Sequence, residues 1–183
     1  MKYTALFRGI NVGGKHIIKM VDLRRFLSKL GMYNVTTYIQ SGNAVFETLL
    51  EEAPLSRIIR DEFRKNFGFE SGVKVRSEND LKILIESLPF SEGELAQMAV
   101  SNPRVEHLYV YFLENPPEKN LLDSVHDIIE GDKLGFGHRE LYILCQKSIR
   151  NSKLAAYLAK RFKFTTVRNW KTVKKLYDMM KKI

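Results

Sequence analysis

The order of strands and helices along the 183 residues predicts an α+β fold. In each half, a strand and a helix precede two strands, a second helix, a fourth strand and a last helix. The halves align at their ends with a constant offset of 92 residues: Val75-Arg76 with Val167-Arg168, Lys82 with Lys174, and Leu84 with Leu176. The order is that of the split βαβ arrangement, so we expect a tandem duplication of two ferredoxin-like subdomains (βαββαβ plus an extra helix) packed together.

The first subdomain is expected at 1–90, with strands at 3–12, 35–40, 43–48 and 73–76. Apolar residues at helical spacing predict one helix that ends at Gly31 and a second that ends near Gly68. Between the two middle strands, Ser41-Gly42 indicates a hairpin turn. A last helix follows Ser77, and the spacing of Ser77 and Asp80 resembles a capping box.

A polar connector is expected at 91–104, with a short helix around 94–100. The second subdomain, 105–183, supplies strands at 107–113, 133–136, 140–146 and 164–168, and its middle hairpin turns at Gly137. Helices are predicted over 121–129, around 154–158 and over 170–180. Each half has only about 80 residues, and a core of that size is small, so packing of the halves would supply further burial.

Composition indicates an ordinary globular protein, with 44% hydrophobic and 28% charged residues. A single cysteine, Cys145, excludes an intramolecular disulfide framework, and the four histidines lack metal-ligand spacing. We therefore expect no metal and no cofactor. No apolar segment approaches the roughly 20 residues that span a membrane, and the first residues lack a signal-peptide pattern. The expected location is the cytoplasm, with no membrane partner.

The net charge of +9 is unevenly distributed. Twelve Lys or Arg residues and a single acid, Asp178, lie in 147–183, so this segment carries +11 and the preceding 146 residues carry −2. A basic surface of this kind attracts polyanions. The alternative is that these residues form a pair of well-solvated surface helices.

The stretch from Leu6 to Lys15 is typical of a strand that runs into a glycine-rich loop. Glycine lets such a loop bring backbone N–H groups close to a ligand. The spacing is not that of a Walker phosphate loop, because Gly9 and Gly13 are one residue too close and His16 follows Lys15. ATP hydrolysis by that mechanism is therefore not predicted, and a turn that merely needs glycine is the alternative.

Two further polar groups stand at predicted turns. Gln40, Ser41 and Asn43 surround a hairpin, where an RNA-recognition motif would need aromatic rings for stacking; ordinary turn chemistry is the alternative. Asn169 is a good N-cap, and the helix start after Arg168 is a plausible anion site. The helix that opens near Ser152-Lys153 is similar. Core packing is the expected role of Trp170, the only tryptophan.

Four stretches together resemble the bacterial family known as domain of unknown function 1697. They are Arg8-Gly9-Ile10-Asn11-Val12-Gly13-Gly14 with Met20, Tyr38-Ile39-Gln40-Ser41-Gly42-Asn43, Ser152-Lys153-Leu154, and Arg168-Asn169-Trp170-Lys171-Thr172-Val173. The chain departs from the family pattern at Ser148-Ile149-Arg150, where relatives usually have a glycine in the turn. The resemblance implies two related ferredoxin-like subdomains and no established activity.

The family's recurring polar residues sharpen one hypothesis, because residues needed only for packing would be apolar. We expect a ligand-binding site in a cleft between the halves, with Lys15 added to these residues: Arg8, Asn11, Lys15, Gln40, Ser41, Asn43, Ser152, Lys153, Arg168 and Asn169. The leading interpretation is a cytoplasmic binding protein for a phosphorylated small molecule or nucleic acid. One alternative is an enzyme for a small anionic substrate, with Lys153 or Lys15 as acid and base. Another is a module that docks an acidic protein.

Overall fold

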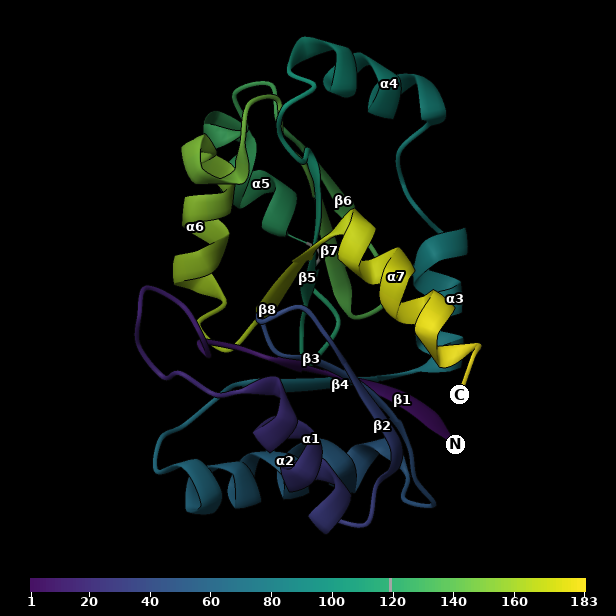
Figure 1. Ribbon diagram of the computed structural model, residues 1–183. Helices are drawn as coiled ribbons and strands as arrows, with labels where there is room; N and C mark the ends of the chain where they lie inside the picture. The colour runs from purple at the N-terminus through teal and green to yellow at the C-terminus, as the bar shows by residue number, and fades with distance from the viewer. Residues whose placement is uncertain (119) are drawn as a thin grey trace. The chain divides into compact units, whose positions relative to one another are not determined.

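The computed structural model describes residues 1–118 and 120–183. Over these residues the chain is a mixed α+β protein with two four-stranded antiparallel sheets and seven α-helices (Figure 1). The chain divides into two compact units. Unit 1 contains Met1–Lys82 and Lys174–Ile183, and unit 2 contains Ile83–Val173. The predicted division at 1–90, 91–104 and 105–183 stays a prediction.

The sheet of unit 1 has the strand order β2-β3-β1-β4. Its strands are β1 (Lys2–Phe7), β2 (Tyr33–Tyr38), β3 (Asn43–Glu47) and β4 (Val73–Ser77). Helices α1 (Met20–Lys29) and α2 (Glu52–Phe67) lie together on one face of this sheet, and α3 (Glu78–Glu86) follows β4 (Figure 1). The predicted hairpin and the helix ends at Gly31 and Gly68 are confirmed.

The core of unit 1 lies between the sheet and helices α1 and α2. Alternate residues of β1 point to this core, which also receives Phe26 from α1 and Phe63 from α2. The ring of Phe63 lies 5.3 Å from that of Phe7 and 5.8 Å from that of Phe26. Leu6, on the opposite face of the sheet, is buried as well. This explains why β1 is an almost continuous apolar run rather than an alternating one.

The sheet of unit 2 has the strand order β6-β7-β5-β8, which matches that of unit 1 element for element. Its strands are β5 (Leu108–Phe112), β6 (Lys133–Phe136), β7 (Glu140–Leu144) and β8 (Thr166–Asn169). The helices that begin in this unit are α4 (Glu92–Ser101), α5 (Leu121–Val125), α6 (Lys153–Arg161) and α7 (Trp170–Met180), with short 3-10 turns at His126–Ile128 and Ile149–Asn151. The residues of α7 from Lys174 onward belong to unit 1.

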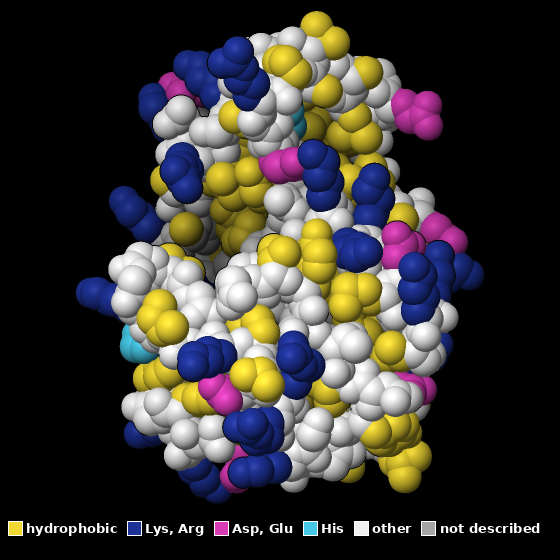
Figure 2. Space-filling view, in the orientation of Figure 1, with side chains coloured by type: hydrophobic (Ala, Val, Ile, Leu, Met, Phe, Trp, Pro, Cys, Tyr) yellow, Lys and Arg dark blue, Asp and Glu magenta, His cyan; other side chains and the backbone are white. Residues whose placement is uncertain are grey.

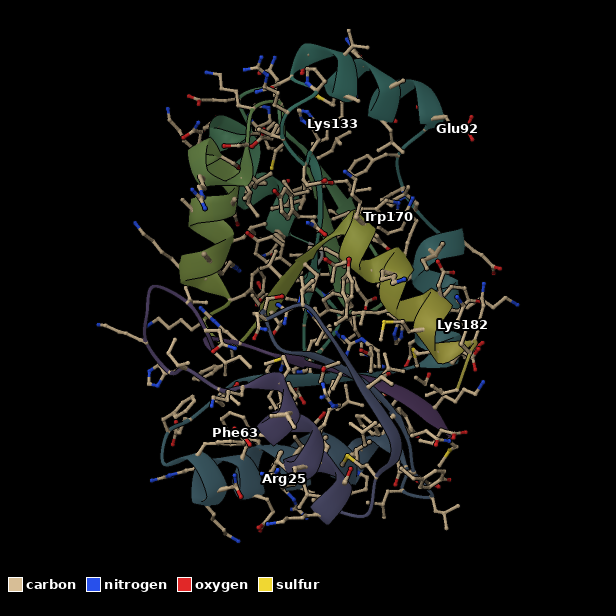
Figure 3. The ribbon with its side chains drawn as sticks, viewed as in Figure 1. Arg25, Phe63, Glu92, Lys133, Trp170 and Lys182 are labelled. Carbon is tan, nitrogen blue, oxygen red and sulfur yellow. The ribbon has the colours of Figure 1, made fainter. Side chains whose placement is uncertain are left out.

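Helix α4 occupies the predicted connector. An N-cap at Ser91 and a salt bridge to β6 hold this helix in place. The Ser91 side chain accepts a hydrogen bond from the Glu94 N–H, and the Glu94 carboxylate accepts one from the Ser91 N–H. The same carboxylate lies 2.6 Å from the ammonium of Lys133 on β6, which Figure 3 labels. These contacts tie the connector helix to the sheet of unit 2.

Two predicted elements are shorter in the structure. The strand expected at 3–12 ends at Phe7, because Gly9 and Asn11 adopt positive φ angles of 75° and 54° that no strand accommodates. The helix expected at 121–129 ends at Val125 and continues as a 3-10 turn. In unit 1, the shorter strand leaves the polar residues of 8–19 in a loop between β1 and α1.

Candidate functional site: the loop after the first strand

The loop of residues 8–19 is closed by one side chain, the carboxamide of Asn11. Its Nδ2 donates to the carbonyl oxygen of Ile18 at 2.9 Å, and its Oδ1 accepts from the Ile18 N–H at 2.8 Å. Nδ2 also donates to the carbonyl oxygen of Gln40 at 2.8 Å. Asn11 therefore closes the loop across seven residues and ties it to the turn between β2 and β3.

Unusual backbone conformations are concentrated in this loop and the turn beside it. Among the described residues, seven of the twelve with positive φ lie in 8–19 or 39–42. They include Ile39, whose φ of 48° is rare for a β-branched residue. Three of the seven are not glycine, namely Asn11, His16 and Ile39, and for such residues this conformation costs on the order of 1–3 kcal/mol each and clusters at ligand sites. The two segments together are a functional-site candidate, which we call the loop–turn surface.

Gly42 allows the turn to dock against the base of the loop. The N–H of Phe7 donates to the Gly42 carbonyl oxygen at 2.8 Å. A Cβ at position 42 would lie 2.6 Å from the side chain of Ile10 and 2.9 Å from that of Phe7. No side chain fits there, and the φ of 78° disfavours one as well.

Asn43 and Ser41 organise the turn itself. The Asn43 side chain donates to the carbonyl oxygen of Tyr38 and to the hydroxyl of Ser41, both at 3.0 Å. Asn43 is fully buried. Gln40 contributes its backbone carbonyl to Asn11, and its side chain is exposed. These three predicted ligand residues thus hold the shape of the turn.

Arg8 stands at the base of the loop with an unsatisfied donor. Its backbone is fixed on both sides, since its N–H donates to Gly72 and its carbonyl accepts from the Ser71 hydroxyl. Within the part of the chain that is described, the buried Nη1 of Arg8 has no hydrogen-bond partner. A buried unpaired donor is costly, so it calls for a specific explanation.

The loop also exposes backbone donors. The N–H groups of Gly9, Gly13 and Gly14 make no hydrogen bond to any described residue, and all three glycines are exposed. Lys15 is exposed on the same loop, and the ring of His16 stacks on Phe69 at 4.1 Å. Five of the ten predicted ligand residues therefore belong to one loop–turn surface: Arg8, Asn11, Lys15, Gln40 and Ser41. Asn43, the first residue of β3, is buried beside this surface.

The other four predicted residues lie in unit 2 and have structural partners there. Ser152 is the N-cap of α6: its hydroxyl accepts from the Ala155 N–H at 2.8 Å and donates to the Asp132 carboxylate at 2.5 Å. The ammonium of Lys153 pairs with Glu130. The hydroxyl of Ser152 thus donates its proton within the fold, and Lys153 pairs with an acid of the same unit.

Arg168 and Asn169 form the junction between β8 and α7. The Asn169 side chain accepts from the Thr172 N–H at 2.9 Å, so the predicted N-cap is confirmed. The buried guanidinium of Arg168 donates to the carbonyl of Val167 at 2.8 Å, and burial lowers the pKa of Arg168 to about 10. Lys171 pairs with Glu106 at 2.6 Å. An anion site at this helix start would therefore compete with existing contacts.

The basic carboxy-terminal segment is divided between the units, because Lys174–Ile183 belongs to unit 1. Several of its charges pair with acids from earlier in the chain, as Lys153 does with Glu130 and Arg161 with Glu118. In Figure 2, Lys and Arg side chains are interspersed with hydrophobic and acidic ones on the visible surface.

Cys145 and His107 are buried in unit 2 and serve the fold. Burial raises the pKa of the Cys145 thiol to about 12, which disfavours the reactive thiolate. Both ring nitrogens of His107 lie within hydrogen-bond distance of backbone carbonyls, those of Cys145 and Asn102. Among the described residues, no group of three or more acidic, His or Cys side chains could hold a metal ion.

Sequence reasoning missed a pocket of about 290 Å³ in unit 1. It lies where the end of the loop meets α1 and the end of α2, and Ile17, Arg25 and Phe67 contribute to its walls. A signal was present, because Arg25 and Lys29 flank Phe26 at a spacing that puts both cations on one side of a helix.

Comparisons with known proteins give a family and a similar solved structure. The model of the family described as "Protein of unknown function (DUF1697)" matches residues 1–142, which include the whole loop–turn surface. The chain belongs to this family. The chain is also similar to a solved structure, that of the conserved bacterial protein SP0830 from Streptococcus pneumoniae, at 27% identity and with a TM-score of 0.76. The likeness covers 98% of each chain. No curated protein matches the chain, and within the described residues no helix is long and apolar enough to cross a membrane.

Proposed function

We propose that this DUF1697 protein binds a small phosphate-bearing ligand at the loop–turn surface of unit 1. The observation that carries this is the buried, unpaired Nη1 of Arg8 at the base of a loop with exposed glycine N–H groups. A phosphate group offers several acceptor oxygens, so it can accept hydrogen bonds both from a guanidinium and from backbone N–H groups. A ligand at this position would offset the cost of the unpaired donor and of the strained backbone.

The charge of the loop favours an anion over a cation. No acidic residue precedes Asp22, whereas the same stretch contains Lys2, Arg8, Lys15 and Lys19. The Asn11 carboxamide holds the loop closed in the free protein, so little ordering is needed on binding. The loop thus combines a preorganised backbone with a positive potential.

The test is a titration of the ¹⁵N-labelled protein with inorganic phosphate and then with adenosine 5′-monophosphate. We expect saturable amide shifts at Gly9, Gly13, Gly14 and Lys15, and about tenfold weaker binding by Arg8→Gln. Arg64→Gln is the matched control, because Arg64 is exposed in the same unit and pairs with Glu70. Unchanged affinity in Arg8→Gln, or shifts elsewhere in the chain, would refute the proposal.

Nucleic acid is a second candidate ligand, favoured by an exposed aromatic ring among basic residues. Phe164 is 79% exposed, and Lys160 and Lys163 beside it are exposed as well. Exposed aromatic rings stack on bases while lysines bind the backbone phosphates. Anisotropy of labelled single-stranded RNA should then show binding that falls steeply with salt and weakens in Phe164→Ser. The same binding by Phe164→Ser would exclude this candidate.

The enzyme alternative depends on an available acid or base. Lys153 pairs with Glu130, so Lys15 is the remaining residue of the two that were proposed. The phosphate titration also serves this alternative, because a substrate analogue would bind at the same loop.

We also propose that the two halves are ferredoxin-like subdomains that arose by duplication, over 1–90 and 105–183. In each sheet the strands stand side by side in the order second, third, first, fourth, counted along the chain of that half. This shared order supports the proposal. The compact units meet after Lys82 and after Val173. With the offset of 92 residues Lys82 is equivalent to Lys174, so the two boundaries lie within one residue of equivalent positions. The free thiol of Cys145 is consistent with a cytoplasmic location.

A further inference from the structure

The pocket beside the loop has an apolar side and a charged side. Phe26 from α1 and Phe67 from α2 supply aromatic walls, and their rings meet edge to face at 5.4 Å. Ile17, at the end of the loop, adds an aliphatic wall and is 69% exposed. Covering an exposed apolar surface of this kind with a ligand ring removes it from water, which favours binding.

The charged side is formed by α1. Arg25 and Lys29 are four residues apart and lie one helical turn from each other. Arg25 pairs with Asp22 at 3.2 Å, but only one of its nitrogens is used and its side chain is 65% exposed. No ion pair of Lys29 with a described residue is present. Figure 3 labels Arg25 on α1 and Phe63 on α2, whose ring contacts those of Phe26 and Phe67.

We propose that this pocket binds a small amphipathic anion. The ligand would have one aromatic or aliphatic ring system, seated against Phe26 and Phe67, and one carboxylate, sulfonate or phosphate group between Arg25 and Lys29. A volume of about 290 Å³ is at the small end of ligand sites and admits one such ring system. A second cation beside the Arg25–Asp22 pair gives the lining a net positive charge, which selects anions over cations.

This site is separate from the proposed phosphate site, since neither Arg8 nor any of the three exposed glycines lines it. The two sites share only the loop. The Asn11 side chain holds the backbone of Ile18, and Ile18 lines the pocket. The residues that would recognise the anion are different in the two sites, so each can be tested without the other.

The test uses the full chain and the fluorescent anionic dye 1-naphthalenesulfonate, which has one ring system and one sulfonate. We expect saturable binding at one site, with amide shifts confined to 17–29 and 66–67. The double variant Arg25→Gln, Lys29→Gln should bind about tenfold more weakly. Ile17→Asp should weaken binding as well, and its exposure makes loss of the fold no concern. The uncharged fluorophore 1-methylnaphthalene should bind more weakly than the sulfonate.

Lys65→Gln is the matched control, because Lys65 is exposed on α2, pairs with Glu62 and does not line the pocket. Arg8→Gln should also leave dye binding unchanged, which separates this inference from the phosphate site. Equal dye affinity in the wild type and the double variant would overturn the proposal. Amide shifts outside the pocket, or no saturable binding, would overturn it too.

Discussion

The two halves of the chain agree at one junction and differ at another. At the end of the fourth strand, the guanidinium of Arg76 donates to the preceding carbonyl at 2.9 Å, and that of Arg168 does the same at 2.8 Å. The next residue then caps the following helix, Ser77 for α3 and Asn169 for α7. The same chemistry at equivalent positions indicates that the frame is repeated.

The loops after the first strands show the difference. The loop after β1 contains three glycines and is closed by Asn11, whereas the segment after β5 has Pro116 and Pro117 and no glycine before α5. Proline fixes φ and removes an N–H donor, so the second loop cannot present the same row of backbone donors. Two halves with one frame therefore differ in the segment that would carry function.

The largest predicted effect concerns the turn that supports the first loop. Gly42→Ala should destabilise the protein by about 3 kcal/mol, because a Cβ meets Ile10 and Phe7 and the left-handed backbone adds strain. Gly137→Ala in the hairpin of the other half should cost only about 1 kcal/mol, since its nearest contacts are 3.1 Å or longer. Urea unfolding followed by circular dichroism measures both. Equal losses would show that the two turns are packed alike.

Asn11→Ala should cost about 2 kcal/mol, because three hydrogen bonds to backbone groups are lost at once. Phosphate binding should weaken in the same variant, since the loop loses its closed shape. The control is Asn115→Ala, an exposed asparagine in the corresponding segment of the other half, which should change stability by less than about 0.5 kcal/mol. If both variants are equally stable, the loops differ less than their contacts indicate.

Much of the frame was predictable from the sequence. The strands of the two hairpins, the ends of α1 and α2 and the caps at Ser77 and Asn169 all follow from local signals, which act over a few residues. The end of β1 was not predictable, because Ile10 and Val12 continue its apolar pattern. Only the structure shows that Asn11 turns the chain there by bonding to Ile18 and Gln40.

The candidate site was predictable only in part. Polar residues at turns serve the fold and the ligand with the same atoms, so sequence alone could not separate Asn43 or Ser152, with buried structural bonds, from Arg8, with an unpaired nitrogen. The pocket of unit 1 was missed because Phe67 and Arg25 come from different helices. Their proximity is a tertiary property that no spacing along the chain reveals.

The shared junction makes a prediction of intermediate size. Ser77→Ala and Asn169→Ala should each cost about 1 kcal/mol, because each removes the side chain that accepts a hydrogen bond from the first turn of its helix. Ser77→Asn and Asn169→Ser should keep most of the stability, since both side chains are good caps. The measurement is the free energy of unfolding of each of the four variants, compared with that of the wild type. Unequal losses in the two alanine variants would break the proposed equivalence.

The smallest effect concerns the capping box of α4, which resembles that of α3 but has a lysine added. The Lys133 ammonium, and then the Ser91 donors, lower the pKa of Glu94 from its ordinary 4.5 to about 2. A lowered folded-state pKa means that the contribution of Glu94 to stability is complete above pH 4.5 and is lost as the pH falls toward 2. Glu94→Gln should therefore flatten the decline of the thermal midpoint in this window. Lys133→Met should bring the pKa of Glu94, measured by its side-chain ¹³C shift, back toward 4.5. A pKa of Glu94 that is low in the wild type and unchanged by Lys133→Met would mean that the lysine contact is absent in solution, and that α4 is held by its cap alone, as α3 is by Ser77 and Asp80.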